Sequence, residues 1–192
     1  MSKSVFISIQ PYYVFLIIAK AMGWDIPQEK TIEVRKTVPK DKDWDKKVII
    51  YCSKNKKSFA KIAKEYQSLM KQHLGKVIGE FVCNCIGKVT WNSNVTQSSL
   101  KKFYNEETCL TDKEVWEYTK GNSFYEWHIS NLVIYDKPRD LDDFMAFGKS
   151  NCDCKNCDNC LYMGIDGICD IKNRYQPLFR PPQSWCYVEE LI

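Results

Sequence analysis

Hydrophobic and polar residues follow one another in short stretches, and the period of each stretch predicts a strand or a helix. Ser4–Ile9, with the sequence SVFISI, alternates and predicts a strand. Pro11 favours the start of a helix that continues to about Met22 and ends at Gly23, because proline is tolerated in the first helical turn and glycine suits a helix end. Lys47–Ser53 is a continuous apolar run, which predicts a buried strand.

Two longer stretches follow in the first half of the chain. Residues 57–75 place apolar side chains at helical spacing with lysines on the opposite face, which predicts one amphipathic helix packed on a sheet. Its apolar positions are Phe59, Ile62, Ala63, Tyr66, Leu69 and Met70. Lys76–Val89 then predicts a long strand, with bulges or bends at Gly79 and Gly87.

The second half of the chain continues this mixture. Thr111 and Glu114 have the spacing of a capping box, which predicts the start of a short helix that ends at Gly121. Ser123–Tyr135 alternates and predicts another strand. Strands of mixed length, a few helices and no regular strand–helix–strand order predict an α+β fold built on a curved sheet or a small barrel.

Length and composition fit one domain. With 192 residues and 44% hydrophobic residues, the chain can bury one good core and a small appendage. Because no Gly-, Ser- or Pro-rich linker divides it, we expect a single domain over residues 1–192 with an insertion at residues 148–176. The longest apolar run, at residues 12–22, contains Lys20 and is too short to span a bilayer, and we see no signal peptide. We therefore expect a cytoplasmic protein without a membrane partner.

Charge is distributed unevenly along the chain. Residues 30–76 contain fourteen Lys or Arg and five Asp or Glu, whereas residues 101–192 contain eleven and sixteen. A basic stretch of this density is compatible with a phosphate-bearing partner such as RNA. A lysine-rich soluble surface is the alternative interpretation.

One short strand combines an acid with two bases. In residues 30–37, KTIEVRKT, the side chains of Thr31, Glu33 and Arg35 share one face of the strand, beside Lys30. The pattern predicts a half-buried strand whose other face carries charge. Such a group can bind a phosphate or polarise a carbonyl, and Glu33 can act as a base if it is buried. A weak structural ion pair is the alternative.

Two aromatic and polar stretches are candidates to complete a binding cleft. Trp127 lies in the strand YEWHIS, and residues 180–190, RPPQSWCYVEE, contain Ser184 and Trp185 after two prolines. Exposed aromatic side chains beside a basic patch suit the stacking of bases. In the alternative interpretation, the aromatic residues of the second stretch point into the core from the last strand.

The cysteines of the insertion suggest a metal site. The sequence CDCKNCDNCLYMGIDGIC holds five cysteines, and Cys-x2-Cys spacing lets two thiolates bind one tetrahedral ion. We expect structural zinc bound by Cys154, Cys157, Cys160 and Cys169, with Cys152 unused. An iron–sulfur cluster, or a loop of free or paired cysteines, is the alternative. Five dispersed cysteines are interpreted as core or surface residues without a metal role: Cys52, Cys83, Cys85, Cys109 and Cys186.

Taken together, these stretches resemble the ASCH domain, in particular ASCH proteins of phages and prophages. The resemblance is carried by IQPYYVFLIIAKAMG, EKTIEVRK, GKVIGEFVC, LTDKEVWEYTKG, FYEWHISNLVIYDKPRDLDDF and PPQSWCYVEEL, and it excludes roughly residues 148–176. The family motif is approximately Gly-x-Lys-x-x-Glu-x-Arg, and Lys30, Glu33 and Arg35 match it. The glycine departs from the motif, because Gly23 lies seven residues before the lysine.

The resemblance implies a PUA-like β-barrel with a cleft lined by this motif, near which the family also places Gln10. Relatives bind RNA or modified nucleobases, and some are amidohydrolases of acetylated cytidine or ribonucleases. In the amidohydrolases the lysine activates a threonine three residues later, but that position is Glu33 here, and a carboxylate cannot serve as the same hydroxyl nucleophile.

The leading hypothesis is therefore binding of RNA, a modified nucleotide or a nucleobase. The expected ligand-binding residues are Gln10, Lys30, Thr31, Glu33, Arg35, Trp127, Ser184 and Trp185. A small hydrolase that acts on a nucleoside or RNA, with Lys30 and Glu33 as catalytic residues, is the alternative. A protein-interaction domain that touches no nucleic acid is a third possibility.

Overall fold

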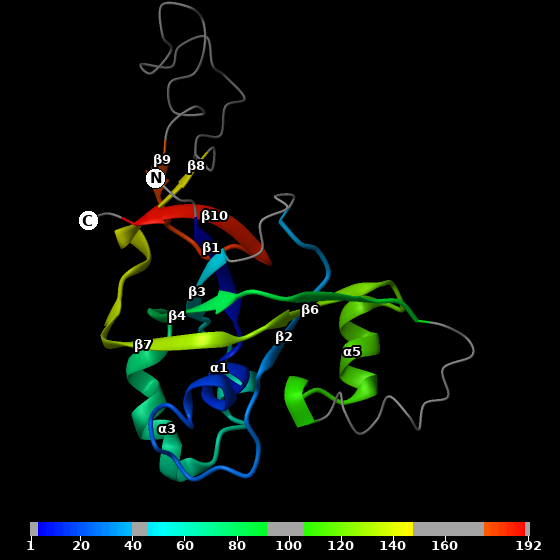
Figure 1. Ribbon diagram of the computed structural model, residues 1–192. Coiled ribbons are helices and arrows are strands. Elements are labelled where there is room, and N and C mark those ends of the chain that lie inside the picture. The colour runs from blue at the N-terminus through cyan, green and yellow to red at the C-terminus, as the bar shows by residue number, and fades with distance from the viewer. Residues whose placement is uncertain (1–3, 40–45, 92–105, 148–174, 191–192) are drawn as a thin grey trace, which may run out of the picture.

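The computed structural model describes residues 4–39, 46–91, 106–147 and 175–190, and within them the strands form two sheets (Figure 1). The larger sheet has the strand order β7-β4-β3-β1-β10-β8-β9, and the smaller has the order β2-β6-β5. The strands of the larger sheet are β1 (Ser4–Ile9), β3 (Lys46–Cys52), β4 (Val77–Cys83), β7 (Ser130–Arg139), β8 (Phe144–Phe147), β9 (Tyr175–Pro177) and β10 (Trp185–Glu190). Those of the smaller sheet are β2 (Ile32–Arg35), β5 (Ile86–Val89) and β6 (Phe124–His128).

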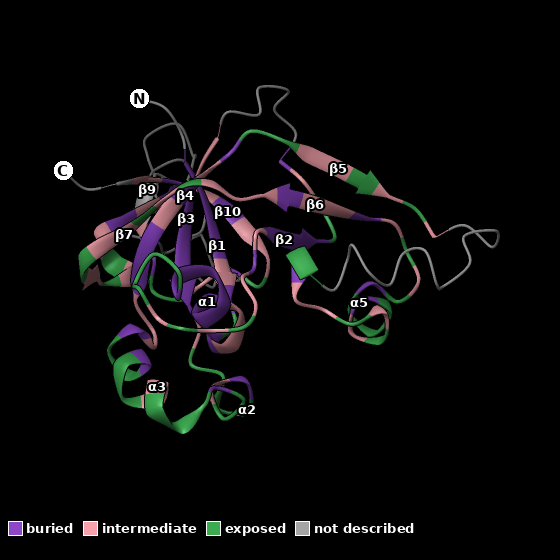
Figure 2. Cartoon of the chain, turned by 60° about the horizontal axis from the view of Figure 1, so that its bottom comes forward, coloured by how far each residue is buried: buried purple, intermediate pink, exposed green. Residues whose placement is uncertain are grey.

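Short helices cover parts of these sheets. They are α1 (Pro11–Ile18), α2 (Lys56–Phe59), α3 (Lys64–Met70) and α5 (Asp112–Thr119), with 3-10 turns η1 (Lys71–His73) and η2 (Leu141–Asp143). Buried residues concentrate on the central strands and on α1, whereas α3 and α5 are largely exposed (Figure 2). None of the described helices is long and apolar enough to cross a lipid bilayer.

The larger sheet is strongly curved, with a core on each face. On one face, residues such as Ile7 of β1 and Ile50 of β3 pack with Ile17 of α1. On the other face, Phe6 of β1 packs against Phe144 of β8, with ring centroids 5.5 Å apart. Strands four places apart in the order, β4 and β8, contribute to this second core, so the sheet curls around it. The curled sheet confirms the α+β fold class expected from the sequence.

Several elements lie where the sequence predicts them. The strand at Ser4–Ile9 is confirmed as β1, and the apolar run at Lys47–Ser53 becomes the buried strand β3. The capping box is also confirmed, because Glu114 N donates to Thr111 Oγ1 and Glu114 Oε2 accepts from Thr111 N. The first helix ends at Ile18 rather than Met22, and the turns that follow end at Gly23 with φ +69°.

The single amphipathic helix predicted for residues 57–75 is wrong. The chain forms α2, then an extended residue at Ala63, then α3 and η1. This break lets Ile62 and Met70 both reach the main core, while Leu69 is left 43% exposed. Tertiary packing therefore overrides the local helical period.

The two long strands predicted for Lys76–Val89 and Ser123–Tyr135 are each two strands. The first divides into β4 and β5, and the second into β6 and β7, with members in different sheets. The ribbon of β4 and β7 thus bends and continues as β5 and β6, to which β2 is added. The bulge expected at Gly79 is confirmed by a register shift against β7, whereas Gly87 keeps its register against β6.

Candidate functional site

Strand β2 is buried on both faces. Ile32, Glu33, Val34 and Arg35 are each at most 7% exposed, so the half-buried strand expected from the sequence is wrong. Val34 packs with Val115 of α5 and Phe124 of β6, which covers the apolar face. The charged face points toward the larger sheet, where Arg35 reaches the backbone of β1. The strand thus brings ionised side chains into the interior, where they need partners.

Glu33 lies between two cations. Its Oε1 is 2.9 Å from Arg35 Nη2, and its Oε2 is 3.4 Å from Lys30 Nζ. The strand geometry explains the first contact, because residues two positions apart share a face. Each carboxylate oxygen therefore has its own positive partner, which offsets the cost of burying the charge.

Lys30 is held by a second set of contacts. Its Nζ donates to the carbonyl oxygen of Thr108 at 2.6 Å and lies 5.4 Å from the centre of the Tyr13 ring. Burial lowers the pKa of Lys30, although the neighbouring carboxylate of Glu33 opposes this shift. Lys30 is 2% exposed, so its amino group faces the interior.

Arg35 connects β2 with the larger sheet. Its Nη2 donates to the carbonyl oxygen of Ser8 in β1 at 2.9 Å, and its Nη1 donates to that of Ser184, just before β10, at 3.2 Å. Its Nε is buried and has no hydrogen-bond partner among the described residues. Most of the N–H donors of Arg35 therefore already bind protein groups.

Lys30, Glu33 and Arg35 line a pocket of about 470 Å³ between the two sheets and α5. Four segments form its wall: the junction of β1 and α1, β2, the region of α5, and the chain before β10. Besides the three charged residues, the lining consists of Ser8, Ile9, Gln10, Tyr13, Val34, Ser53, Leu110, Glu114, Glu117, Tyr118 and Gln183. The pocket thus combines two aromatic rings, two amides, hydroxyls and charged groups.

The formal charge of this lining is negative. Lys30 and Arg35 face three carboxylates, those of Glu33, Glu114 and Glu117. Burial opposes the ionisation of Glu114, but hydrogen bonds from Thr111 and the nearby Lys61 hold its pKa below the usual value. An open basic groove is therefore not what surrounds this motif.

Tyr13 also lines the pocket. Its hydroxyl donates to Glu114 Oε1 at 3.5 Å. Burial, together with the carboxylates of Glu114 and Glu33, raises the pKa of Tyr13 well above its usual value. The phenol therefore stays protonated at neutral pH and acts as a hydrogen-bond donor.

Four of the residues expected from the sequence line the pocket: Gln10, Lys30, Glu33 and Arg35. Thr31 does not line it, and its hydroxyl oxygen is buried without a hydrogen-bond partner among the described residues. Trp127 is 1% exposed and belongs to the main core, so the expected stacking surface at Trp127 is wrong.

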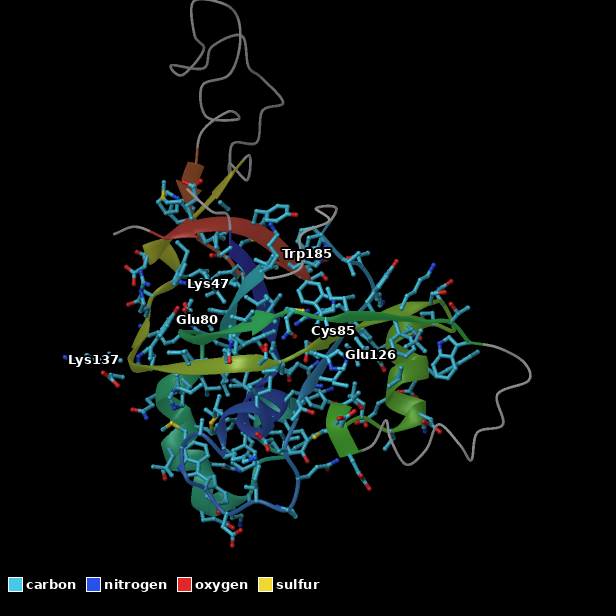
Figure 3. The ribbon with its side chains drawn as sticks, in the orientation of Figure 1. Lys47, Glu80, Cys85, Glu126, Lys137 and Trp185 are labelled. Atoms are coloured by element: carbon cyan, nitrogen blue, oxygen red, sulfur yellow. The ribbon has the colours of Figure 1, made fainter. Side chains whose placement is uncertain are left out.

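Ser184 and Trp185, which were also expected to bind ligand, lie outside the lining. The carbonyl oxygen of Ser184 accepts from Arg35, and its hydroxyl is buried without a partner among the described residues. Trp185 lies at the start of β10, where its Nε1 donates to Thr37 Oγ1 at 2.9 Å (Figure 3). Its ring packs edge-on against Tyr187, next to the main core, as the alternative interpretation of this stretch expected.

Ten of the fourteen lining residues were not among the expected ligand-binding residues, including Tyr13, Glu114, Glu117, Tyr118 and Gln183. Three of them belong to α5, and their spacing of three and four residues places them near one another on its surface. That spacing was a usable signal. What the sequence did not reveal is that α5 packs beside β2.

The predicted zinc ligands, Cys154, Cys157, Cys160 and Cys169, lie outside the described residues, as does Cys152. Among the residues that are described, no group of three or more His, Cys, Asp or Glu side chains could hold a metal ion. Cys52, Cys83 and Cys186 are buried, Cys109 is partly buried and Cys85 is exposed, in keeping with their interpretation as core or surface residues.

Comparison with known proteins identifies the fold. No protein-family model and no curated protein matches this sequence significantly. Crystal structures of two mutant forms of ZmASCH from Zymomonas mobilis match it with a TM-score of 0.52 and 16% identity each. The match covers 98% and 97% of this chain and 91% and 89% of theirs. The protein therefore has the α+β fold of these ASCH structures, without a closed barrel among the described strands.

Proposed function

We propose that the pocket beside β2 binds a nucleobase, presented by RNA or by a modified nucleotide. The observation that carries the proposal is the buried arrangement of Lys30, Glu33 and Arg35 in a pocket that also contains two tyrosine rings and two amides. Fixed polar groups beside aromatic faces are what the edge and the face of a base require.

A base fits this pocket better than a phosphate. A phosphate would meet three carboxylates, and the Nη atoms of Arg35 already donate to Glu33 and to two backbone carbonyls. A base edge has donors for the carboxylate of Glu33, and both donors and acceptors for the amides of Gln10 and Gln183. A volume of about 470 Å³ also lies within the usual range for small-molecule sites.

The fold supports the same assignment. The motif Lys30, Glu33 and Arg35 resembles that of ASCH domains, whose relatives bind RNA or modified nucleobases, and the fold is that of an ASCH protein.

Calorimetric titration with cytidine, N4-acetylcytidine, uridine, adenosine and guanosine tests the proposal. At least one of them should bind, and Gln10→Ala and Gln183→Ala should each weaken it by about two- to tenfold, the value of one hydrogen bond. Both glutamines are exposed, so the melting temperature should not change. Gln72→Ala, at an exposed position of η1 outside the pocket lining, is the matched control. Absence of binding at millimolar concentration, or equal affinity in all variants, would contradict the proposal.

A small hydrolase in the same pocket is the second candidate, and the burial of Glu33 beside Lys30 favours it. Burial lowers the pKa of Lys30, which increases the share of the neutral amine that can act as a base. Release of acetate from N4-acetylcytidine and cleavage of end-labelled RNA test this activity. Turnover that is lost in Glu33→Gln would support the hydrolase, and no turnover of either substrate would leave a binding protein.

A further inference from the structure

We propose that the ligand is a single strand of RNA that continues from the first pocket into a second one, which holds the neighbouring nucleotide. This inference rests on the function proposed above. It names the class of ligand as an oligonucleotide rather than a free nucleoside.

The second pocket adjoins the first. It has a volume of about 540 Å³ and is lined by the chain after β3, by η2 and by residues 178–181. Ser53 lines both pockets. The segment before β10 also serves both, because Phe179 and Arg180 line the second pocket and Gln183 lines the first. Two separate stretches of chain therefore contribute to the walls of both pockets.

The second pocket offers an aromatic ring and two cations to a ligand. Phe179 is 66% exposed, so its ring is accessible to a ligand. Lys54 and Arg180 are exposed, and neither forms an ion pair with another described residue. An aromatic platform beside cations that follow the backbone is the arrangement by which proteins bind single-stranded nucleic acid.

The two pockets differ in whether their cations are already paired. In the first, Lys30 and Arg35 both pair with Glu33. In the second, Asp140 pairs with Lys76, and Lys54 and Arg180 form no ion pair with another described residue. A base suits the hydrogen-bonding groups of the first pocket, and the phosphodiester suits the cations of the second.

The side chain of Lys54 lies over Gly75. Gly75 has φ +74°, and a Cβ at that position would overlap Lys54 Cε, so the lysine side chain lies across the glycine. At the junction of the pockets, the hydroxyl oxygen of Ser53 is buried and has no hydrogen-bond partner among the described residues.

Fluorescence anisotropy with a fluorescein-labelled RNA hexamer of mixed sequence tests this inference. Phe179→Ala should weaken hexamer binding at least fivefold, because each stacked base contributes substantially. Arg180→Gln should weaken it and reduce the slope of log affinity against log salt concentration by about 0.7, the value for one phosphate contact on a single strand. Neither variant should change the affinity for the nucleoside that binds the first pocket. Leu69→Ala and Lys113→Gln, at exposed positions on α3 and α5, are the matched controls.

The outcomes separate this inference from the proposed function. If a nucleoside binds but Phe179→Ala and Arg180→Gln leave hexamer binding unchanged, the second pocket is not part of the site and the proposed function stands. If the hexamer binds through Phe179 and Arg180 while no nucleoside binds and Gln10→Ala has no effect, the proposed function fails. If a hexaglutamate peptide displaces the hexamer as well as unlabelled hexamer does, the second pocket recognises charge alone and the inference is overturned.

Discussion

Arg35 and Glu33 form a buried ion pair within one strand, with Arg35 Nη2 2.9 Å from Glu33 Oε1. The same guanidinium binds the backbone of β1 and of the chain before β10. The motif of Lys30, Glu33 and Arg35, which the sequence predicts to be a binding site, therefore also connects the two sheets. Substitutions there should change the stability of the fold as well as any affinity of the pocket, whereas Gln10 and Gln183 are exposed.

Arg35→Ala should reduce the free energy of unfolding by about 3–5 kcal/mol, because it leaves the carboxylate of Glu33 buried without its closer partner. Urea denaturation followed by circular dichroism measures this. Lys113→Ala, which breaks an exposed pair with Glu117, is the control and should cost less than about 1 kcal/mol. Equal effects of the two substitutions would show that the pair at β2 has no structural role.

Gly79→Ala should be far more destabilising than Gly87→Ala. A Cβ at Gly79 would lie against the backbone carbonyl of Val133, which can move only together with its strand. A Cβ at Gly87 would lie 3.1 Å from the end of the Glu126 side chain, which can move (Figure 3). Overpacking of this kind costs about 1–3 kcal/mol. Thermal denaturation of both variants is the measurement, and similar melting temperatures would contradict the close packing at the bulge.

Acidification should destabilise the protein through His73. This residue is 3% exposed, its two ring nitrogens have no hydrogen-bond partner among the described residues, and burial lowers its pKa. In the unfolded chain the pKa returns to about 6.5, so below that pH the unfolded state takes up a proton that the folded state does not. Stability should therefore fall as the pH decreases from 7 toward 5.

Denaturation of the wild type and of His73→Leu at a series of pH values isolates this contribution. The variant should show a weaker dependence on pH between about 5 and 7, whatever its absolute stability. The control is His128→Leu, which removes the other histidine of the chain. Parallel pH profiles for the wild type and His73→Leu would exclude His73 as the cause.

Protein purified without added metal should contain about one equivalent of zinc if Cys154, Cys157, Cys160 and Cys169 form a tetrahedral thiolate site. Because thiolates bind zinc only when deprotonated, acid or a strong chelator should release the metal and increase proteolysis within residues 152–169 first. Elemental analysis is the direct measurement.

A pair of cysteine variants controls this experiment. Cys157→Ser should abolish the zinc content, and Cys85→Ser, at an exposed position in the described part of the chain, should retain it. Less than about a tenth of an equivalent of metal, with all five clustered thiols freely reactive, would mean that this stretch has no metal site.

Local patterns predicted those elements whose structure depends on neighbouring residues. The alternation in Ser4–Ile9, the apolar run after Lys47 and the capping box at Thr111 each predicted its element correctly. The breaks at Asn84–Cys85 and at Ile129 were not predictable in this way, because there the chain leaves one sheet for the other. The hydrophobic pattern of a stretch does not show which sheet its strand joins.

In the candidate site, too, only the residues that are close in sequence could be predicted from local patterns. Lys30, Glu33 and Arg35 were found because they lie within six residues of each other in the sequence. Tyr13, Tyr118 and Gln183 come from three distant segments that only the fold brings together. The burial of β2 on its charged face was missed for the same reason, since its cover comes from β1 and the chain before β10.

The position of β10 has a consequence for how the chain folds. This strand lies between β1 and β8, and it pairs Val188 with Ser4. During synthesis β1 can therefore pair with its parallel neighbour β3 early, but its other edge has no partner until residues 185–190 leave the ribosome. Contacts between residues so distant in sequence slow folding. Until β10 arrives, the exposed edge of β1 is the place where a nascent chain can pair wrongly with another copy or be held by a chaperone.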